Sequence, residues 1–226
     1  MISIDEDCRR LLALLTHEMR SPGAVVAGYL RMLKGPSISD MPSREQKMIE
    51  EANRSCARLM HIVQELSDFR QLVDNNELQR EPVAIFGICE EVVQKAVDEG
   101  CTVDFVVDEG DREATVDGDE LKLRQAISAL LACSCREHGT LALVETRAFV
   151  HRNGSGALAV IAFGEPGSAE CAEDVLKHRE MVFDQWRGGM GLALPIAQQI
   201  VEVHHGNVWA IPGMRASCAV SLPLTA

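Results

Sequence analysis

The sequence has no apolar run that approaches the roughly 20 residues needed for a membrane-spanning helix. Its first ten residues, MISIDEDCRR, are polar and acidic, whereas a secretory signal peptide has an apolar centre. We therefore expect no membrane segment and no signal peptide in this chain.

Basic residues are scarce relative to acidic ones. The chain has 22 Lys and Arg against 34 Asp and Glu, which gives a formal net charge of -12. Such a charge repels phosphate backbones and anionic lipid headgroups. Nucleic acid and anionic membrane surfaces are therefore not expected as the main partners.

Cysteine pairs with metal-ligand spacing are also missing. The eight cysteines are scattered, and no two form a CxxC motif, so the sequence indicates neither a zinc site nor a disulfide framework. We interpret six or seven of them as small apolar residues in core positions. A reducing, cytoplasmic location is the simplest expectation, and no metal ligands are predicted.

The character of the sequence changes near residue 75. The chain has 226 residues, enough for one large domain or two modest ones, and 46% of them are hydrophobic. The segment DNNELQRE, residues 74–81, is polar and reads as a linker. We predict a helical domain over residues 1–75 and a second domain over residues 76–226.

Two long helices are predicted in the first domain, over residues 5–34 and 43–73. In both, apolar residues recur every three or four positions, which produces a seam with a 3.5-residue period. The seam of the first helix is Leu12, Leu15, Met19, Pro22, Val26, Tyr29 and Leu33. One hairpin cannot bury such seams, but two hairpins can, so we expect a homodimer built as a four-helix bundle.

The second domain alternates between strand and helix patterns. VAIF, residues 83–86, leads into a helix over about 86–99, and further helices are predicted over 121–137 and 190–204. Strands are predicted over 102–107, 113–117, 140–152, 157–163, 207–213 and 218–224, with a hairpin turn at NGSG. This order favours an α/β sandwich, a mixed sheet with helices on one face.

The first helix carries a titratable pair beside a helix breaker. If Leu12 and Met19 face the bundle core, His17 lies at the outermost heptad position, flanked by Glu18. Ser21 follows one turn later, and Pro22 should bend the helix because it has no N–H to donate to the carbonyl of Glu18. An exposed imidazole beside a carboxylate can act as a nucleophile, although most exposed His–Glu pairs are only a solvated surface.

The motif HEMRSP, residues 17–22, resembles the H-box of sensor histidine kinases, with Ser21 in place of the usual threonine. The resemblance implies that His17 accepts a phosphoryl group, that Glu18 is its acid/base partner and that Ser21 assists dephosphorylation. It also implies that residues 1–75 form a dimerisation and histidine-phosphotransfer domain. The remainder would then be the ATP-binding domain of that family.

The second domain resembles the family in outline but departs from it at nucleotide-binding positions. GGMGLALPIAQQIVEVHHGN resembles the second glycine box and the helix after it, with Gly189 and Gly191 as phosphate-binding residues. GDELKLRQAISALLACSCRE resembles the N-box, whose two asparagines fall on Ala129 and Cys133. Neither side chain supplies the oxygen ligand that magnesium prefers.

Two further departures affect the nucleotide site. AFGEPG, residues 162–167, resembles the first glycine box, with Phe163 at the position of the adenine-binding aspartate and Glu165 at that of the first glycine. FDQWRGGMG, residues 183–191, leaves little room for an ATP lid. We therefore interpret the nucleotide site as vestigial and expect no cofactor, with ATP and magnesium as the alternative.

Three functions are compatible with this sequence. The leading hypothesis is a dimeric histidine phosphotransferase, in which His17 exchanges a phosphoryl group with aspartates of response-regulator receiver domains. The second is a divergent ATP-dependent sensor kinase core, which an intact N-box asparagine would have favoured. The third is a non-enzymatic scaffold or regulator of a partner kinase, which an altered H-box would have favoured.

Overall fold

The computed structural model of the protein describes residues 6–34, 42–73, 78–108, 110–139, 142–153, 156–168, 170–172, 183–184, 192–211, 213–214 and 217–225. The chain divides into two compact units, Met1–Asp74 and Asn75–Ala226. Each unit is described separately below.

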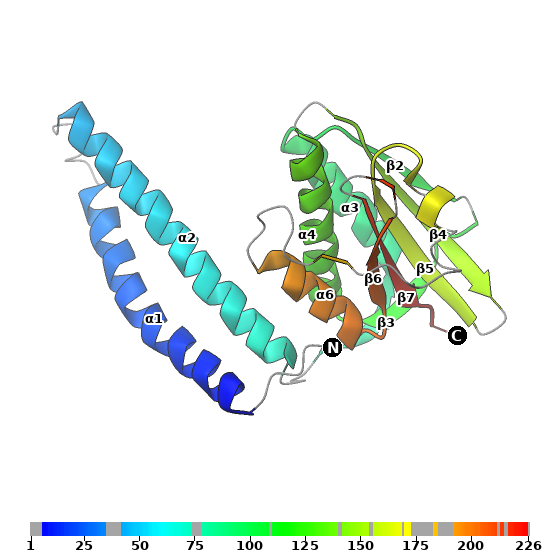
Figure 1. The fold of residues 1–226 in the computed structure, drawn as a ribbon, viewed down its shortest axis with the longest axis horizontal. Helices are drawn as coiled ribbons and strands as arrows, with labels where there is room; N and C mark the ends of the chain where they lie inside the picture. Colours follow the sequence, from blue (N-terminus) through cyan, green and yellow to red (C-terminus); the bar gives the residue numbers. More distant parts are fainter. Residues whose placement is uncertain are drawn as a thin grey trace. The chain divides into compact units, whose positions relative to one another are not determined.

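The first unit is a hairpin of two long helices, α1 (Glu6–Leu33) and α2 (Ser43–Val73), which pack along each other (Figure 1). Charges at two helix ends favour these limits, because Arg31 lies in the last turn of α1 and Glu45 in the first turn of α2. The helices begin and end within one residue of the limits predicted from the heptad pattern.

Small residues of α1 lie at its contact with α2. Thr16 and Gly23 are buried and lie seven residues apart, on one side of the helix. Gly23 is close to α2, since a Cβ atom there would collide with the sulfur of Met60, and the Cys56 thiol donates to the Gly23 carbonyl at 3.8 Å. The predicted seam is therefore turned partly away from α2.

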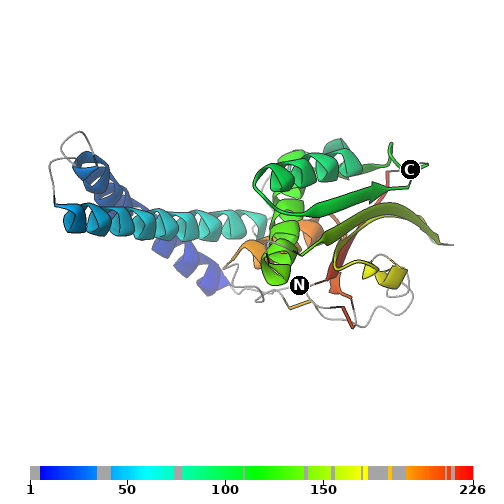
Figure 2. The same cartoon turned by 90° about the horizontal axis from the view of Figure 1, so that it is seen from above.

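The second unit contains a five-stranded mixed sheet (Figures 1 and 2). Its strand order is β2-β4-β5-β7-β6, with β2 and β4 parallel and the other neighbours antiparallel. The strands are β2 (Val103–Val107), β4 (Val144–Asn153), β5 (Gly156–Gly164), β6 (Asn207–Ala210) and β7 (Cys218–Pro223). The predicted hairpin at NGSG is present, with Asn153 opposite Gly156 in the β4–β5 register.

Three helices cover one face of this sheet: α3 (Ile85–Asp98), α4 (Glu120–His138) and α6 (Ala193–Val203) (Figure 1). Their apolar sides and the central strands form the core, in which the largest fully buried side chains include Phe86, Leu130, Phe163 and Ile196. The fold class predicted from the sequence, a helical hairpin followed by an α/β sandwich, is confirmed.

One strand was not predicted. β1 (Glu81–Ala84) pairs antiparallel with β3 (Thr115–Gly118) as a separate two-stranded sheet, whereas the sequence analysis expected β3 in the mixed sheet and only a lead-in before α3. β1 has four residues, one of them Pro82, and only Val83 is buried. A strand of this length shows too little alternation to be recognised, and proline is tolerated there because the strand lies at an edge.

Two expectations concern the chain as a whole. Within the described ranges, no helix is long and apolar enough to cross a membrane. Seven cysteines are described as free thiols, of which three are fully buried and four are half-buried. Six or seven cysteines were expected in core positions, whereas among the seven described only Cys89, Cys133 and Cys218 are buried.

Candidate functional site

His17 projects from α1 into solvent. Its side chain is 81% exposed, and that of Glu18 is 68% exposed. Because Thr16 is buried, the next residue is rotated by about 100° around the helix and turns away from the hairpin contact. The outward position expected from the heptad pattern is the one observed.

A single hydrogen bond orients the imidazole. The Nδ1 atom of His17 lies 3.2 Å from the Oε1 atom of Glu18. When Nδ1 carries the proton, it donates to this carboxylate and leaves the lone pair of Nε2 free at the surface. This arrangement presents an accessible nitrogen nucleophile.

Ser21 and Pro22 lie one turn beyond the histidine. Ser21 is exposed, and its position four residues after His17 places it on the same side of α1. The helix continues through Pro22, although proline removes one backbone hydrogen bond of this turn. Three predicted site residues, His17, Glu18 and Ser21, therefore share one solvent-facing surface.

The positions expected to bind magnesium lie on α4. Cys133 is completely buried and Ala129 is half-buried. Neither side chain has an oxygen atom, so the residues present do not fit a magnesium ion that bridges nucleotide phosphates. The described residues contain no group of three or more His, Cys, Asp or Glu side chains arranged to hold a metal.

The position expected to recognise adenine is occupied by an apolar side chain. Phe163, near the end of β5, is completely buried between its strand partners Thr146 and Cys218. A phenyl ring cannot accept the hydrogen bond of an adenine amino group, and leaving that donor unpaired costs about 1–3 kcal/mol. Phe163 therefore does not fit a nucleotide base at this position.

Hydrogen bonds to side chains within the protein hold the turn after β5 together. The Ser168 hydroxyl donates to the Glu165 carbonyl at 2.5 Å and lies 2.9 Å from the Ser217 hydroxyl. The N–H of Gly167 donates to the Glu145 carboxylate at 3.2 Å. The Gly167 N–H is a backbone donor of the kind that binds phosphate, and it is already paired with the Glu145 carboxylate. The negative charge of this carboxylate would also repel a phosphate.

The second glycine box cannot be placed. Gly189 and Gly191, the predicted phosphate-binding residues, lie outside the described residues. α6 begins directly after this segment, and the side chain of Leu192 at its N-terminus makes no capping hydrogen bond. The role of these two glycines stays a prediction.

The sequence did not predict the roles of two residues, His204 and Arg80, whose hydrogen bonds hold the end of α6 in place. His204 at the end of α6 is 2% exposed, with Nδ1 2.7 Å from the Ile200 carbonyl, and its Nε2 accepts from the Asp119 N–H at 2.9 Å. Burial lowers the pKa of His204, so the neutral ring holds α6 against the N-terminus of α4. Arg80 donates to the Val203 carbonyl at 2.6 Å. The motif HHGN was noticed in the sequence, but nothing in it indicated the hydrogen bonds that His204 and Arg80 make.

Comparisons with known proteins agree with the H-box. The sequence profile of the His Kinase A (phospho-acceptor) domain matches residues 9–74. The chain is 25% identical to the sensor histidine kinase TrcS of Mycobacterium tuberculosis, over 93% of this chain and 43% of TrcS. It is 22% identical to the adaptive-response sensory kinase SasA of Synechocystis, over 95% of this chain and 59% of SasA. The chain thus spans about half the length of the curated relatives it matches.

Solved structures show the same fold. Full-length ShkA in complex with AMPPNP aligns with a TM-score of 0.69 and 21% identity, over 96% of this chain and 46% of ShkA. The histidine kinase AdeS of Acinetobacter baumannii aligns with a TM-score of 0.54 and 17% identity, over 93% of this chain and 98% of AdeS. Both the helical hairpin and the α/β sandwich lie within these alignments.

Proposed function

Because the chain is a histidine kinase family protein with an ATPase-like second domain, we propose that it acts in two-component signalling as a dimeric histidine phosphotransferase. In this proposal His17 takes a phosphoryl group from an aspartyl phosphate of one receiver domain and passes it to an aspartate of another. The observation that carries the proposal is the exposed His17–Glu18 pair in an intact H-box, on a chain whose described nucleotide positions do not fit ATP.

The chemistry uses groups that are on this surface. The Nε2 lone pair of His17 attacks the phosphorus of the aspartyl phosphate, an N–P bond forms, and the P–O bond to the receiver aspartate breaks. Positive charge develops on the imidazole, and the carboxylate of Glu18 stabilises it through the Nδ1 proton. Reversal of these steps on a second receiver completes the relay. The proposal assigns no metal or nucleotide to this chain.

The exposed seam of the hairpin supports a homodimer. Large apolar side chains of α1 stay solvent-exposed in the single hairpin, namely Leu15, Met19, Val25, Val26, Tyr29, Met32 and Leu33. An isolated soluble hairpin rarely leaves such a set uncovered, whereas a second hairpin would bury it in a four-helix bundle. His17 would still face outward, toward a receiver domain.

The cysteine content supports a reducing location. All seven described cysteines are free thiols, and they are spread over both units. Free thiols persist where glutathione and thioredoxin keep them reduced. We place the proposed relay in the cytoplasm on this ground.

The alternative is an ATP-dependent sensor kinase core, and the relatives favour it, because several are named sensor histidine kinases and one solved structure contains AMPPNP. In that case nucleotide would bind near Gly189 and Gly191, and His17 would receive the γ-phosphoryl group of ATP. The third hypothesis, a non-enzymatic regulator, requires that His17 never carry a phosphoryl group.

One labelling experiment separates the three functions. The chain is incubated either with a phosphorylated receiver domain or with ATP and magnesium, and acid-labile label on the chain is measured. We expect label from the receiver and none from ATP, with complete loss in His17→Ala. His205→Gly, which removes another exposed histidine, is the matched control and should label normally. Label from ATP would establish the kinase, and absence of label from both donors would establish the regulator.

A further inference from the structure

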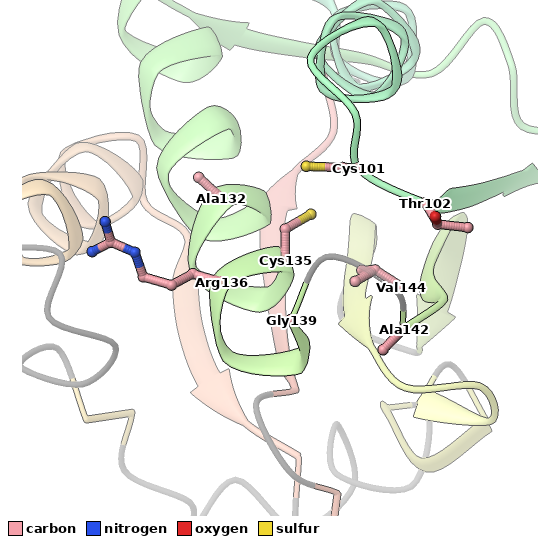
Figure 3. Close-up of a pocket in the computed structure, with 8 residues that line it drawn as sticks. All are labelled: Cys101, Thr102, Ala132, Cys135, Arg136, Gly139, Ala142 and Val144. Atoms are coloured by element: carbon pink, nitrogen blue, oxygen red, sulfur yellow. The ribbon is translucent and has the colours of Figure 1, made fainter.

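A cavity of about 350 Å³ lies in the second unit (Figure 3). It opens between the turn after α3 and the C-terminal part of α4, and its lining is mainly apolar. Two cysteines line it. Cys101 follows the turn at the end of α3, and Cys135 lies in the last turns of α4.

The two thiols face each other. In Figure 3 the sulfur atoms of Cys101 and Cys135 point toward one another across the cavity. Burial raises the pKa of Cys135 to about 12, and the neighbouring Cys101 thiol adds to this shift. Cys135 is therefore a protonated thiol at neutral pH, beside a second thiol.

This pair differs from the three buried cysteines in accessibility and from the other two half-buried cysteines in its surroundings. Cys89, Cys133 and Cys218 are completely buried. Cys101 and Cys135 are half-buried, as are Cys56 and Cys171, but they border an open cavity together. The cavity gives an attacking molecule a path to the sulfur atoms and a departing thiol a path out.

One charged residue belongs to the lining. Arg136 follows Cys135 on α4, and in Figure 3 its side chain extends away from the two sulfur atoms. The surroundings of the thiols are therefore apolar. Glutathione disulfide is a small disulfide that can serve as the oxidant.

We propose that Cys101 and Cys135 form a redox-modifiable dithiol that a small disulfide such as glutathione disulfide oxidises to an intramolecular disulfide. Such a bond would tie the turn after α3 to the C-terminal end of α4. Cys101 lies outside regular structure, between Gly100, with φ of +97°, and β2. A shift of this turn can bring the sulfur atoms to the roughly 2.05 Å that an S–S bond requires.

The reaction proceeds by two thiol–disulfide exchanges. Cys101 loses its proton to solvent, and its sulfur attacks one sulfur of glutathione disulfide, which releases one glutathione thiolate and leaves a mixed disulfide. Cys135 then loses its proton to solvent, attacks the Cys101 sulfur and releases the second glutathione thiolate. The released thiolates take up the two protons. The two cysteines lose two electrons in total, and glutathione disulfide gains them.

The order of attack follows from the contacts. Cys135 is a poor first nucleophile because burial and the Cys101 contact keep it protonated. Once Cys101 carries glutathione, its thiol no longer raises the pKa of Cys135, and Cys135 lies beside the mixed disulfide. In a reducing compartment the product would be transient, as expected of a redox-responsive site.

Mass spectrometry tests this assignment on the full chain. The reduced protein is incubated with glutathione disulfide, quenched in acid, alkylated and digested. We expect a linked pair of peptides containing Cys101 and Cys135, and an intact mass lower by two hydrogens. A stable glutathione adduct on wild-type Cys101 without the linked pair would overturn the proposal, as would absence of any reaction at both residues.

Two variants identify the roles. Cys135→Ser should retain glutathione on Cys101, because the resolving thiol is missing. Cys171→Ser removes another half-buried cysteine and should form the Cys101–Cys135 link at the wild-type rate. A link that disappears in Cys171→Ser would contradict the assignment of the pair.

Discussion

At the scale of single residues, the His17 side chain meets its neighbour Glu18 across 3.2 Å, and both are largely exposed. We expect Glu18→Ala to slow phosphoryl transfer to His17 by about one to two orders of magnitude, because the carboxylate no longer orients the ring or stabilises its charge. The measurement is the rate of label transfer from a phosphorylated receiver.

Glu18→Gln is the matched variant for this prediction. Its amide oxygen can still accept the Nδ1 proton but carries no charge, so its rate should fall between those of wild type and Glu18→Ala. An unchanged rate in Glu18→Ala would show that the carboxylate has no role in transfer.

The buried His204 predicts a pH dependence of stability. Its pKa is lowered in the folded state, mainly by burial, whereas an unfolded histidine titrates near about 6.5. The unfolded state therefore binds more protons, so the free energy of unfolding falls as the pH drops below about 6.5 toward the folded pKa. This residue contributes a slope of at most about 1.4 kcal/mol per pH unit.

Chemical denaturation of wild type and His204→Gln between pH 8 and pH 5 measures this slope. The variant should be less stable at pH 8, because it loses fitted hydrogen bonds to Ile200 and Asp119, but its stability should fall less steeply with acid. Parallel curves for the two proteins would contradict the prediction.

At the scale of elements, the C-terminus of α6 ends in a strained residue. His205 has φ of +60°, and the N–H groups of His205 and Gly206 donate to the carbonyls of Glu202 and Val201, which is a Schellman motif. Glycine is the preferred residue at this position because a side chain there adds strain.

We therefore expect His205→Gly to raise the free energy of unfolding by about 0.5–1 kcal/mol, with the greater chain entropy of glycine in the unfolded state opposing part of the gain. Thermal or chemical denaturation provides the measurement. His205→Ala keeps a Cβ atom and should give no comparable gain, so equal stabilities of the two variants would refute the strain argument.

The long helices were predicted from the sequence, whereas one short strand was missed. Both long helices were predicted because their seams repeat over about 30 residues, and the outward position of His17 followed from the same period. β1 was missed because four residues that include Pro82 show almost no alternation. The pairing of β1 with β3 is a tertiary contact, and no local pattern specifies it.

In the molecule as a whole, the residues that depart from the ATP-binding pattern could be identified from the sequence, whereas the long-range contacts of the second unit could not. Phe163 and Cys133 could be recognised by chemical type alone. The Ser168–Ser217 contact joins residues 49 positions apart, and the His204–Asp119 contact joins residues 85 positions apart. Such pairs depend on how the strands and helices are assembled.

A mutation on the predicted seam tests the proposed homodimer. Val26 is exposed in the single hairpin and lies on the predicted seam, so Val26→Glu should leave the hairpin folded but place charges in the interface of the proposed dimer. We expect light scattering to show a monomer, or a dimer weakened by at least about tenfold.

Ala24→Glu provides the control for the dimer. Ala24 is also exposed, but it lies seven residues after His17 on the outward face of α1. Its variant should remain dimeric. A wild-type chain that is monomeric at micromolar concentration would contradict the proposed four-helix bundle.

The central claim is that His17 relays a phosphoryl group between two receiver domains without ATP. It is tested most directly by mixing the chain with one phosphorylated receiver and one unphosphorylated receiver, in the absence of nucleotide, and following label on all three proteins. The account predicts transient acid-labile label on His17, followed by label on the second receiver, and neither in His17→Ala. Label that reaches the second receiver equally well in His17→Ala, or that never appears on His17, would contradict it.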